Sequence, residues 1–289
     1  MAVSFTESVK PHLAILRSDY NHAERFLLGT RALSQRDGLQ EACRKCSDQR
    51  MPWDFWLIFL FLAVAVPWRG QLRLRKLLER PQITTPEKLA LYAATIAFQW
   101  LLLAMVVWRS LARGLTPREL GLGGRPTAQL LVVGLLGALL LGVLQGLNLR
   151  RIGKMEGAAP EFMRKLASRI LPHSMVELLP YFALAVTAGV CEEFVYRGFA
   201  MAALAHSGMA SWAIVLLSSI LFGLAHAYQG RSGILGTGVL GILFAVARIL
   251  YRSLLPVMIW HTAVDLVAGM AGPRYLHQAS EVQQVNKNQ

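Results

Sequence analysis

Seven apolar runs follow one another along the chain, and each approaches the length of about 20 residues that a helix needs to cross a lipid bilayer. Charged residues make up only 16% of the sequence, against about 25% in soluble domains. These two features predict an all-α fold, a polytopic transmembrane helix bundle with about seven spans (six to eight). The runs cover residues 53–68, 88–108, 127–147, about 178–205, about 209–228, about 233–251 and about 254–272.

Basic residues concentrate between the apolar runs, at 69–88, 109–125 and 150–168, within a formal net charge of +13. Such a charge indicates nucleic-acid binding in a soluble protein, but loops rich in Lys and Arg beside apolar runs are typical of multi-pass membrane proteins. We expect an integral, multi-pass protein of the cell membrane of a prokaryote, with the lipid bilayer and no nucleic acid among its partners. The basic loops and the equally basic residues 1–50 favour opposite orientations, so the orientation stays open.

Changes in composition divide the chain into four parts. We expect a polar N-terminal extension at 1–50, two transmembrane helices at 51–112, a core at 113–273 that carries the functional residues, and a polar tail at 274–289. Cys43 and Cys46 form a lone Cys-x-x-Cys, whereas a structural zinc site needs a second ligand pair at suitable spacing. We interpret them as loop cysteines without a chemical role.

Two adjacent carboxylates and an arginine, Glu192, Glu193 and Arg197, interrupt the fourth apolar run. A charged side chain near the bilayer centre costs about 2.5–3.5 kcal/mol, so such residues face a protein interior or a water-filled cavity. Glu193 and Arg197 are four residues apart and can pair on one helix face. Glu192 lies about 100° around the helix and is free for another role. We predict that Glu192 is a base and that Glu193 supports it.

The later runs contain further ionisable residues, whereas the first three runs have no intramembrane counterpart. His226 lies near the end of the fifth run, and His261 and Asp265 lie four residues apart in the seventh, where the carboxylate can hold the imidazole in one tautomer. If these helices converge, His226, His261 and Asp265 can act together with Glu192 to activate water by general base catalysis. Alternatively, Glu192, His226 and His261 can bind a zinc ion, because two histidines and a carboxylate form a known catalytic zinc set.

The ordered motifs resemble those of the CPBP family of intramembrane proteases, which includes type II CAAX prenyl endopeptidases and the Abi bacteriocin-processing and immunity proteins. The resemblance covers about residues 115–272 and marks 113–273 as a CPBP-like intramembrane protease core. It implies an endopeptidase that hydrolyses a peptide bond of a membrane-associated protein or peptide, either a prenylated CAAX tail or a leader peptide. The motifs are Glu192-Glu193-x-x-x-Arg197, Phe222-x-x-x-His226 and His261-x-x-x-Asp265.

The resemblance also implies a role for each motif residue. Glu192 and His226 would activate the water that attacks the scissile peptide bond, whether as a glutamate protease or as a metalloprotease. Glu193 and Arg197 would complete the first motif, with Arg197 shaping it.

The residue at position 265 departs from the commoner form of the family, which has asparagine there. The resemblance implies that His261 and residue 265 stabilise the developing oxyanion. Asparagine can donate a hydrogen bond to an oxyanion, but an ionised aspartate cannot. Asp265 must therefore be protonated, orient His261 or help to hold a metal.

Two other functions are compatible with buried Glu and His residues. A proton-coupled membrane transporter uses such residues as a proton relay, but it predicts a repeat of broken helices in both halves of the chain. The lack of intramembrane ionisable residues in the first three runs argues against it. A non-catalytic immunity or binding member of the same family is the second alternative, and the presence of all motif residues argues against it.

Overall fold

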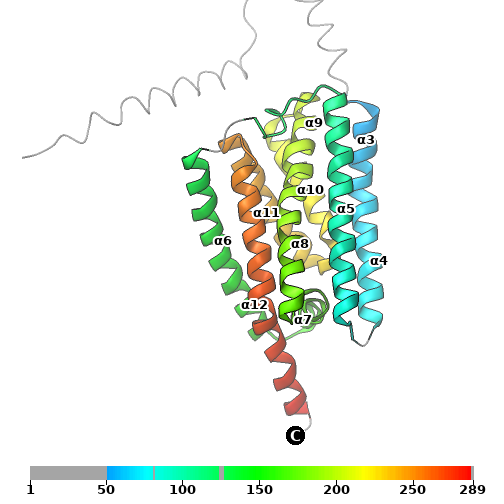
Figure 1. The fold of residues 1–289 in the computed structure, drawn as a ribbon, viewed down its shortest axis with the longest axis vertical. Coiled ribbons are helices and arrows are strands. Elements are labelled where there is room, and N and C mark those ends of the chain that lie inside the picture. The colour runs from blue at the N-terminus through cyan, green and yellow to red at the C-terminus, as the bar shows by residue number, and fades with distance from the viewer. Residues whose placement is uncertain (1–50, 81, 124–126, 288–289) are drawn as a thin grey trace, which may run out of the picture. The chain divides into compact units, whose positions relative to one another are not determined.

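The computed structural model describes residues 51–80, 82–123 and 127–287, with side chains as far as Leu276. The predictions for residues 1–50, including Cys43 and Cys46, lie outside the described residues. Helices form the described part of the chain, which contains no β-strand (Figure 1). In chain order they are α3 (Trp53–Leu60), η1 (Phe61–Ala65), α4 (Val66–Glu79), α5 (Thr85–Ala112), α6 (Ala128–Lys154), α7 (Ala158–Ile170), α8 (Met175–Glu193), η2 (Phe194–Ala200), α9 (Met201–His206), α10 (Ser211–Ala225), η3 (Ala227–Gln229), α11 (Gly230–Tyr251) and α12 (Leu255–Lys287).

Six helices of the described chain are long and apolar enough to cross a membrane, and the apolar helix α10 is shorter. The long helices are Trp53–Glu79, Thr85–Ala112, Ala128–Lys154, Met175–His206, Ala227–Tyr251 and Leu255–Leu276. Their outward faces remain apolar, as on α6, where Leu135, Leu136 and Leu139 are exposed. The predicted polytopic helical bundle is therefore confirmed.

The basic stretches 69–88 and 150–168 and the polar tail 274–289 are partly helical. Within 69–88, the first helix continues through η1 and α4 to Glu79, so Arg69 and Arg73 are helical residues. Within 148–172, α6 extends to Lys154 and α7 follows. Beyond residue 273, α12 continues through Pro273 to Lys287. These stretches contain many Arg, Lys, Leu, Gln and Glu residues, which favour helix even where they are too polar for a membrane span.

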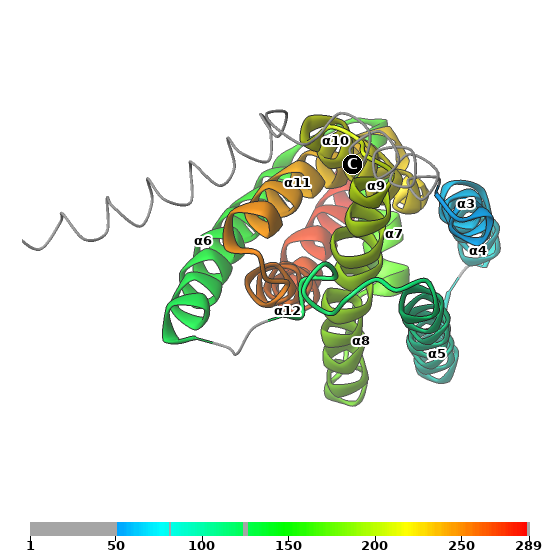
Figure 2. The same cartoon turned by 90° about the horizontal axis from the view of Figure 1, so that it is seen from above.

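Helix α8 lies at the centre of the helices that form the site. Viewed from above, α5 lies on one side of α8 and α12 on the other, and α6 packs outside α12 (Figure 2). Helices α10 and α11 pack against each other beside the α8–η2–α9 segment. Among the described spans, Met175–His206 has the largest buried share, and every residue of η2 is buried. Side chains of α8 can therefore meet side chains from both halves of the sequence.

A buried ion pair fixes α5 against the beginning of α8. Lys88 Nζ lies 3.0 Å from Glu177 Oε2 and also donates to the carbonyl of Leu171 at 2.9 Å. The side chains of Lys88 and Glu177 are only 3% and 4% exposed. On another helix of the first half, Asp54 accepts hydrogen bonds from Arg109 and Arg113. The buried ionisable residues Asp54 and Lys88 thus lie at the beginnings of their helices, outside the middle of the first spans.

Candidate active site

A close approach of α8 and α12 brings the two motif helices together. Gly189 lies on α8 one turn before Glu193, and a Cβ at this position would lie 2.1 Å from Thr262 Oγ1 and 2.9 Å from the backbone oxygen of Met258. Only glycine leaves room for this helix crossing, since real Cβ atoms do not approach a backbone oxygen so closely. The crossing places Glu193 beside His261.

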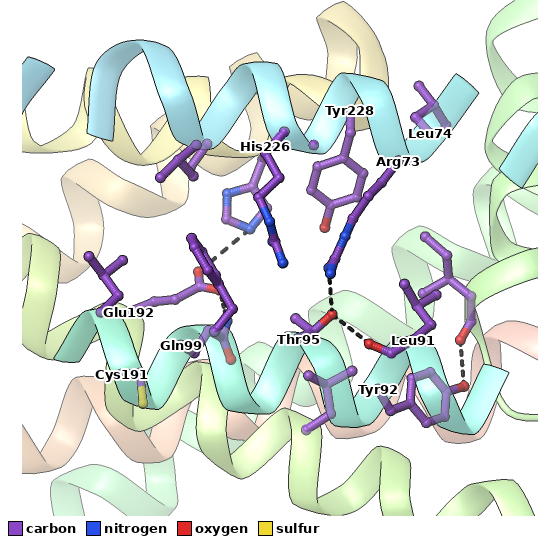
Figure 3. Close-up of a pocket in the computed structure, with 18 of the residues that line it drawn as sticks. Arg73, Leu74, Leu91, Tyr92, Thr95, Gln99, Cys191, Glu192, His226 and Tyr228 are labelled. Carbon is purple, nitrogen blue, oxygen red and sulfur yellow. Dashed lines mark hydrogen bonds and ion pairs between the residues drawn. The ribbon is translucent and has the colours of Figure 1, made fainter. Parts of the chain in front are cut away.

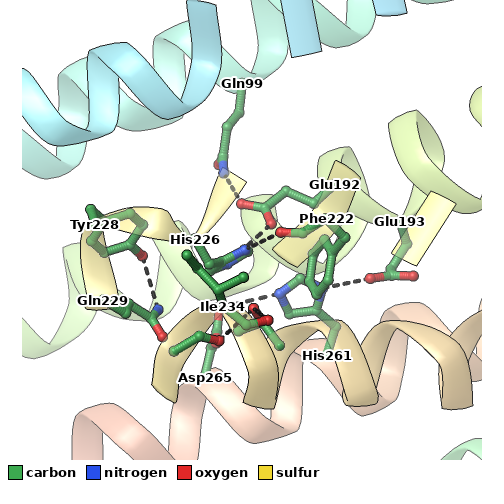
Figure 4. A network of polar contacts seen from close by, with 12 residues as sticks. Gln99, Glu192, Glu193, Phe222, His226, Tyr228, Gln229, Ile234, His261 and Asp265 are labelled. Carbon is green, nitrogen blue, oxygen red and sulfur yellow. Dashed lines mark hydrogen bonds and ion pairs between the residues drawn. The ribbon is translucent and has the colours of Figure 1, made fainter. Parts of the chain in front are cut away.

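Glu193 joins Arg197 and His261 in a buried network, and Figure 4 shows its contact with His261. Arg197 Nη1 donates to Glu193 Oε1 at 3.0 Å, which is the ion pair predicted from their spacing. His261 Nδ1 lies 2.7 Å from the same oxygen, so the imidazole carries its proton on Nδ1 and donates it to Glu193. The Arg197 guanidinium lies over the ring of Phe222, 4.1 Å from its centroid. The side chains of Glu193 and Arg197 are 0% exposed.

Glu192 points away from this network, toward α5 and the end of α10 (Figure 4). Its Oε1 accepts a hydrogen bond of 2.6 Å from Gln99 Nε2. Its Oε2 lies 3.8 Å from His226 Nε2 and has no hydrogen-bond partner among the described residues. The side chains of Glu192 and His226 are 20% and 14% exposed. The two neighbouring carboxylates therefore occupy different environments, as their positions on the helix predict.

The tautomer of His226 follows from its second contact. His226 Nδ1 lies 2.9 Å from the carbonyl oxygen of Phe222. A carbonyl oxygen can only accept, so Nδ1 carries the proton and Nε2 of the neutral ring is an acceptor. Two acceptors, His226 Nε2 and Glu192 Oε2, consequently face each other across 3.8 Å. A molecule with two O–H donors, such as water, matches this arrangement.

A cavity of about 220 Å³ opens beside Glu192 and His226 (Figure 3). Its walls come from α4, α5, α7, α8, η2 and the segment around η3, and they are mainly apolar. Glu192, His226 and Gln99 lie toward one end, and Arg73 and Tyr92 toward the other (Figure 3). The volume far exceeds the roughly 10–15 Å³ that a single water molecule requires.

His261 and Asp265 are not among the residues that line this cavity. His261 Nε2 lies 3.7 Å from Asp265 Oδ2, beyond hydrogen-bond distance, and the Asp265 side chain is 35% exposed. The carboxylate that holds the tautomer of His261 is therefore Glu193 rather than Asp265. The structure thus brings Glu192 and His226 together at the cavity. Glu193, Arg197 and His261 form a separate buried group that does not line it.

The three residues expected as alternative zinc ligands do not form a common metal site. The described residues contain no group of three or more His, Cys, Asp or Glu side chains placed to hold a metal ion. His261 directs one ring nitrogen at Glu193 and the other toward Asp265, so it does not complete a set with Glu192 and His226. As placed, these residues do not fit a bound zinc ion.

Gln99, Arg69 and Arg73 line the cavity but were not predicted as site residues. Gln99 is uncharged, so ionisable residues inside the apolar runs do not point to it; its signal in the sequence is that it is the one amide of the run 88–108. Arg69 and Arg73 follow the first apolar run, and hydropathy does not show that the first helix extends to Glu79.

Comparison with known proteins supports the resemblance found in the sequence. The family model described as type II CAAX prenyl endopeptidase Rce1-like matches residues 174–267, which contain all three motifs. No curated protein and no solved structure is found to match. Together with the apolar helices, the match to a family of membrane proteases identifies an integral, multi-pass membrane protein.

Proposed function

We propose, from the match of residues 174–267 to the type II CAAX prenyl endopeptidase Rce1-like family, that this protein is an intramembrane endopeptidase whose water is activated by Glu192 and His226. The observation that carries the proposal is the pair of facing acceptors, Glu192 Oε2 and His226 Nε2, 3.8 Å apart beside the cavity. One water molecule can donate a hydrogen bond to each acceptor and direct a lone pair toward a substrate carbonyl.

Hydrolysis then proceeds in two steps. Glu192 takes a proton from the water as its oxygen bonds to the carbonyl carbon, and the carbonyl oxygen becomes an oxyanion. When the carbon–nitrogen bond breaks, Glu192 returns the proton to the leaving amine nitrogen. Gln99 holds Glu192 Oε1 through its 2.6 Å hydrogen bond, which leaves Oε2 for the water. A positioned general base contributes about 10²–10⁴-fold to the rate.

The family resemblance assigns the oxyanion to His261. Because Nδ1 donates to Glu193, only Nε2 could donate to a substrate; His261 does not line the cavity, so this role requires the bound substrate to extend beyond the cavity. Donation from Nε2 requires the doubly protonated imidazole, whose charge is balanced by Glu193 at 2.7 Å. Asp265, half-buried and 3.7 Å from Nε2, contributes little to this balance and does not itself donate to the oxyanion.

The substrate is a membrane-associated protein or peptide, and the family suggests a prenylated CAAX tail, with a leader peptide as the other candidate. The mainly apolar cavity walls support an apolar segment next to the scissile bond. The assignment to the cell membrane of a prokaryote remains a prediction from the sequence.

The test compares purified Glu192→Gln and His226→Ala variants with the parent protein in lipid nanodiscs. Glu79→Gln, a change at an exposed carboxylate of α4, is the matched control. Cleavage is measured on fluorogenic farnesylated CAAX peptides, the same peptides without the lipid, and leader-type peptides. We expect the two site variants to lose cleavage while the control retains it. Full cleavage by Glu192→Gln would show that Glu192 is not the base.

The same variants address the two alternative functions. A proton-coupled transporter predicts proton-dependent uptake into proteoliposomes that requires Glu192. A binding or immunity function predicts a cellular phenotype that survives the loss of both Glu192 and His226. The endopeptidase proposal predicts neither result.

A further inference from the structure

Two arginines line the cavity from one face of α4. Arg69 and Arg73 are four residues apart, which places them on successive turns, about 6 Å apart along the helix axis. Both side chains are partly buried. They belong to the first helix of the described chain, outside the segment that matches the protease family.

Both guanidinium groups turn inward, onto α5. The Arg69 guanidinium carbon lies 3.9 Å from the centroid of the Phe98 ring. Arg73 Nη1 donates to Thr95 Oγ1 at 3.0 Å, and Figure 3 shows this side chain reaching across the cavity from α4 to α5. An arginine that only placed its charge at the membrane interface would instead extend along the protein surface toward water. These contacts hold the two cations beside the space where a ligand can lie.

Neither arginine has a carboxylate within ion-pair distance among the residues that the structure describes. Other arginines of the helical bundle do: Arg109 and Arg113 pair with Asp54, and Arg197 pairs with Glu193. Two positive charges in a mainly apolar cavity favour an anionic group from outside the protein. Arginine is well suited to this, because its planar guanidinium binds a carboxylate through two parallel hydrogen bonds.

We propose that Arg69 and Arg73 bind a carboxylate of the peptide substrate while the scissile bond lies at Glu192 and His226. The inference rests on the proposed endopeptidase function and adds a specificity site to it. The cavity supports this arrangement, because it is continuous from the Glu192–His226 pair to Arg73 and is too large for a single water molecule. The carboxylate is either the free C-terminus of the substrate or an acidic side chain near the scissile bond.

The test pairs changes in the protein with changes in the peptide. Arg69→Gln, Arg73→Gln and the double variant are compared with Arg75→Gln, which removes an exposed arginine from the same helix. Three peptides share the same sequence around the scissile bond: the first has a free C-terminus, the second an amidated C-terminus, and the third an amidated C-terminus with a glutamate placed before it. Steady-state cleavage gives KM and kcat for each combination.

We expect the double variant to raise KM about 10- to 100-fold for a peptide that carries the recognised carboxylate, with little change in kcat. The peptide without a carboxylate should bind the parent protein as weakly as the carboxylate peptide binds the double variant. Its KM should not change when the arginines are replaced. Whichever of the two carboxylate peptides shows this coupling identifies the source of the charge. Arg75→Gln should behave as the parent does.

An equal loss on all three peptides would overturn the proposal, because it would mean that the arginines only support the fold or the membrane position of α4. Direct binding of the same peptides to the Glu192→Gln variant, measured by fluorescence anisotropy, separates this result from failure of the proposed function. Carboxylate-dependent binding without cleavage by any form of the protein would contradict the endopeptidase function and leave the binding site in place. The absence of carboxylate-dependent binding alongside normal cleavage would contradict the binding site alone.

Discussion

His261 Nδ1 lies 2.7 Å from Glu193 Oε1, the same oxygen that accepts the guanidinium of Arg197 at 3.0 Å. One carboxylate oxygen therefore orients a histidine from α12 and neutralises an arginine from η2. The sequence alone suggested Asp265 for the first of these tasks, because it lies one helical turn from His261. The second glutamate of the pair is thus the residue that joins the first and last motifs, while the first glutamate faces the cavity.

The Asp265→Asn variant should retain activity within about threefold of the parent, since the hydrogen bond that orients His261 comes from Glu193 and a 3.7 Å contact contributes little. Steady-state cleavage of the farnesylated peptide and the melting temperature measure the effect. Loss of cleavage with an unchanged melting temperature would instead make Asp265 essential to the reaction.

The Glu193→Gln variant should lower the melting temperature strongly. It leaves the fully buried charge of Arg197 without its partner, and breaking a buried ion pair in this way typically costs about 3–5 kcal/mol. Glu161→Gln, on the exposed surface of α7, is the control and should leave the melting temperature unchanged. A Glu193→Gln protein as stable as the parent would show that the ion pair does not stabilise the fold.

The Gln99→Ala variant should lower kcat about 10- to 100-fold, because it removes a short hydrogen bond to the ionised form of Glu192. KM should change little, and Gln99→Glu should be at least as impaired, because it places a second carboxylate against the first. The control is Leu101→Ala, two residues along α5, where the side chain is exposed toward the lipid. If Gln99→Ala and Leu101→Ala behave alike, Gln99 does not position the base.

The arrangement of donors also predicts the response to metal removal. Because both ring nitrogens of His261 face carboxylates outside the Glu192–His226 pair, we expect the purified protein to bind zinc no better than a Glu192→Ala/His226→Ala variant does. Cleavage should survive EDTA and phenanthroline. The measurements are elemental analysis and cleavage after chelation. Stoichiometric zinc that disappears in the double variant would establish a metal centre at these residues.

The helix crossing at Gly189 gives a prediction about stability. Gly189→Ala should destabilise the protein by roughly 1–3 kcal/mol, because the added methyl group overlaps Thr262 and the backbone of Met258. The matched control is Gly236→Ala on α11, where a Cβ meets nothing within 4 Å and alanine favours the helix. Thermal unfolding in the same detergent compares the two. Equal melting temperatures for the two variants would show that the α8–α12 crossing tolerates a wider separation.

Much of this architecture follows from the lengths of the apolar runs and from the free-energy cost of burying charge. The lengths of the apolar runs predict the helical bundle, and the four-residue spacing of Glu193 and Arg197 predicts their ion pair and the separate direction of Glu192. The partner of His261 is not predictable in this way. It depends on how α8 crosses α12, which is a long-range packing contact at Gly189, whereas sequence spacing shows only neighbours on the same helix.

The cavity residues of α4 and α5 are not predictable from the sequence for a different reason. Arg69 and Arg73 follow an apolar run of only 16 residues, so the helix was expected to end before them. Hydropathy identifies the apolar part of a span but does not show how far the helix continues into a basic segment. Gln99 carries no charge, and a search for buried ionisable groups therefore passes over it.

The cavity has two kinds of wall, which come from different parts of the chain. Glu192 and His226 belong to the segment that the family model covers, whereas Arg69, Arg73 and Gln99 come from the two helices that precede it. Because the two groups lie in separate segments, substitutions can change Arg69 and Arg73 without changing Glu192 and His226. Grafting residues 53–112 of a relative onto this chain, with Gln99 retained, would then exchange its preference among peptides while the proposed base and its hydrogen-bond partner stay in place.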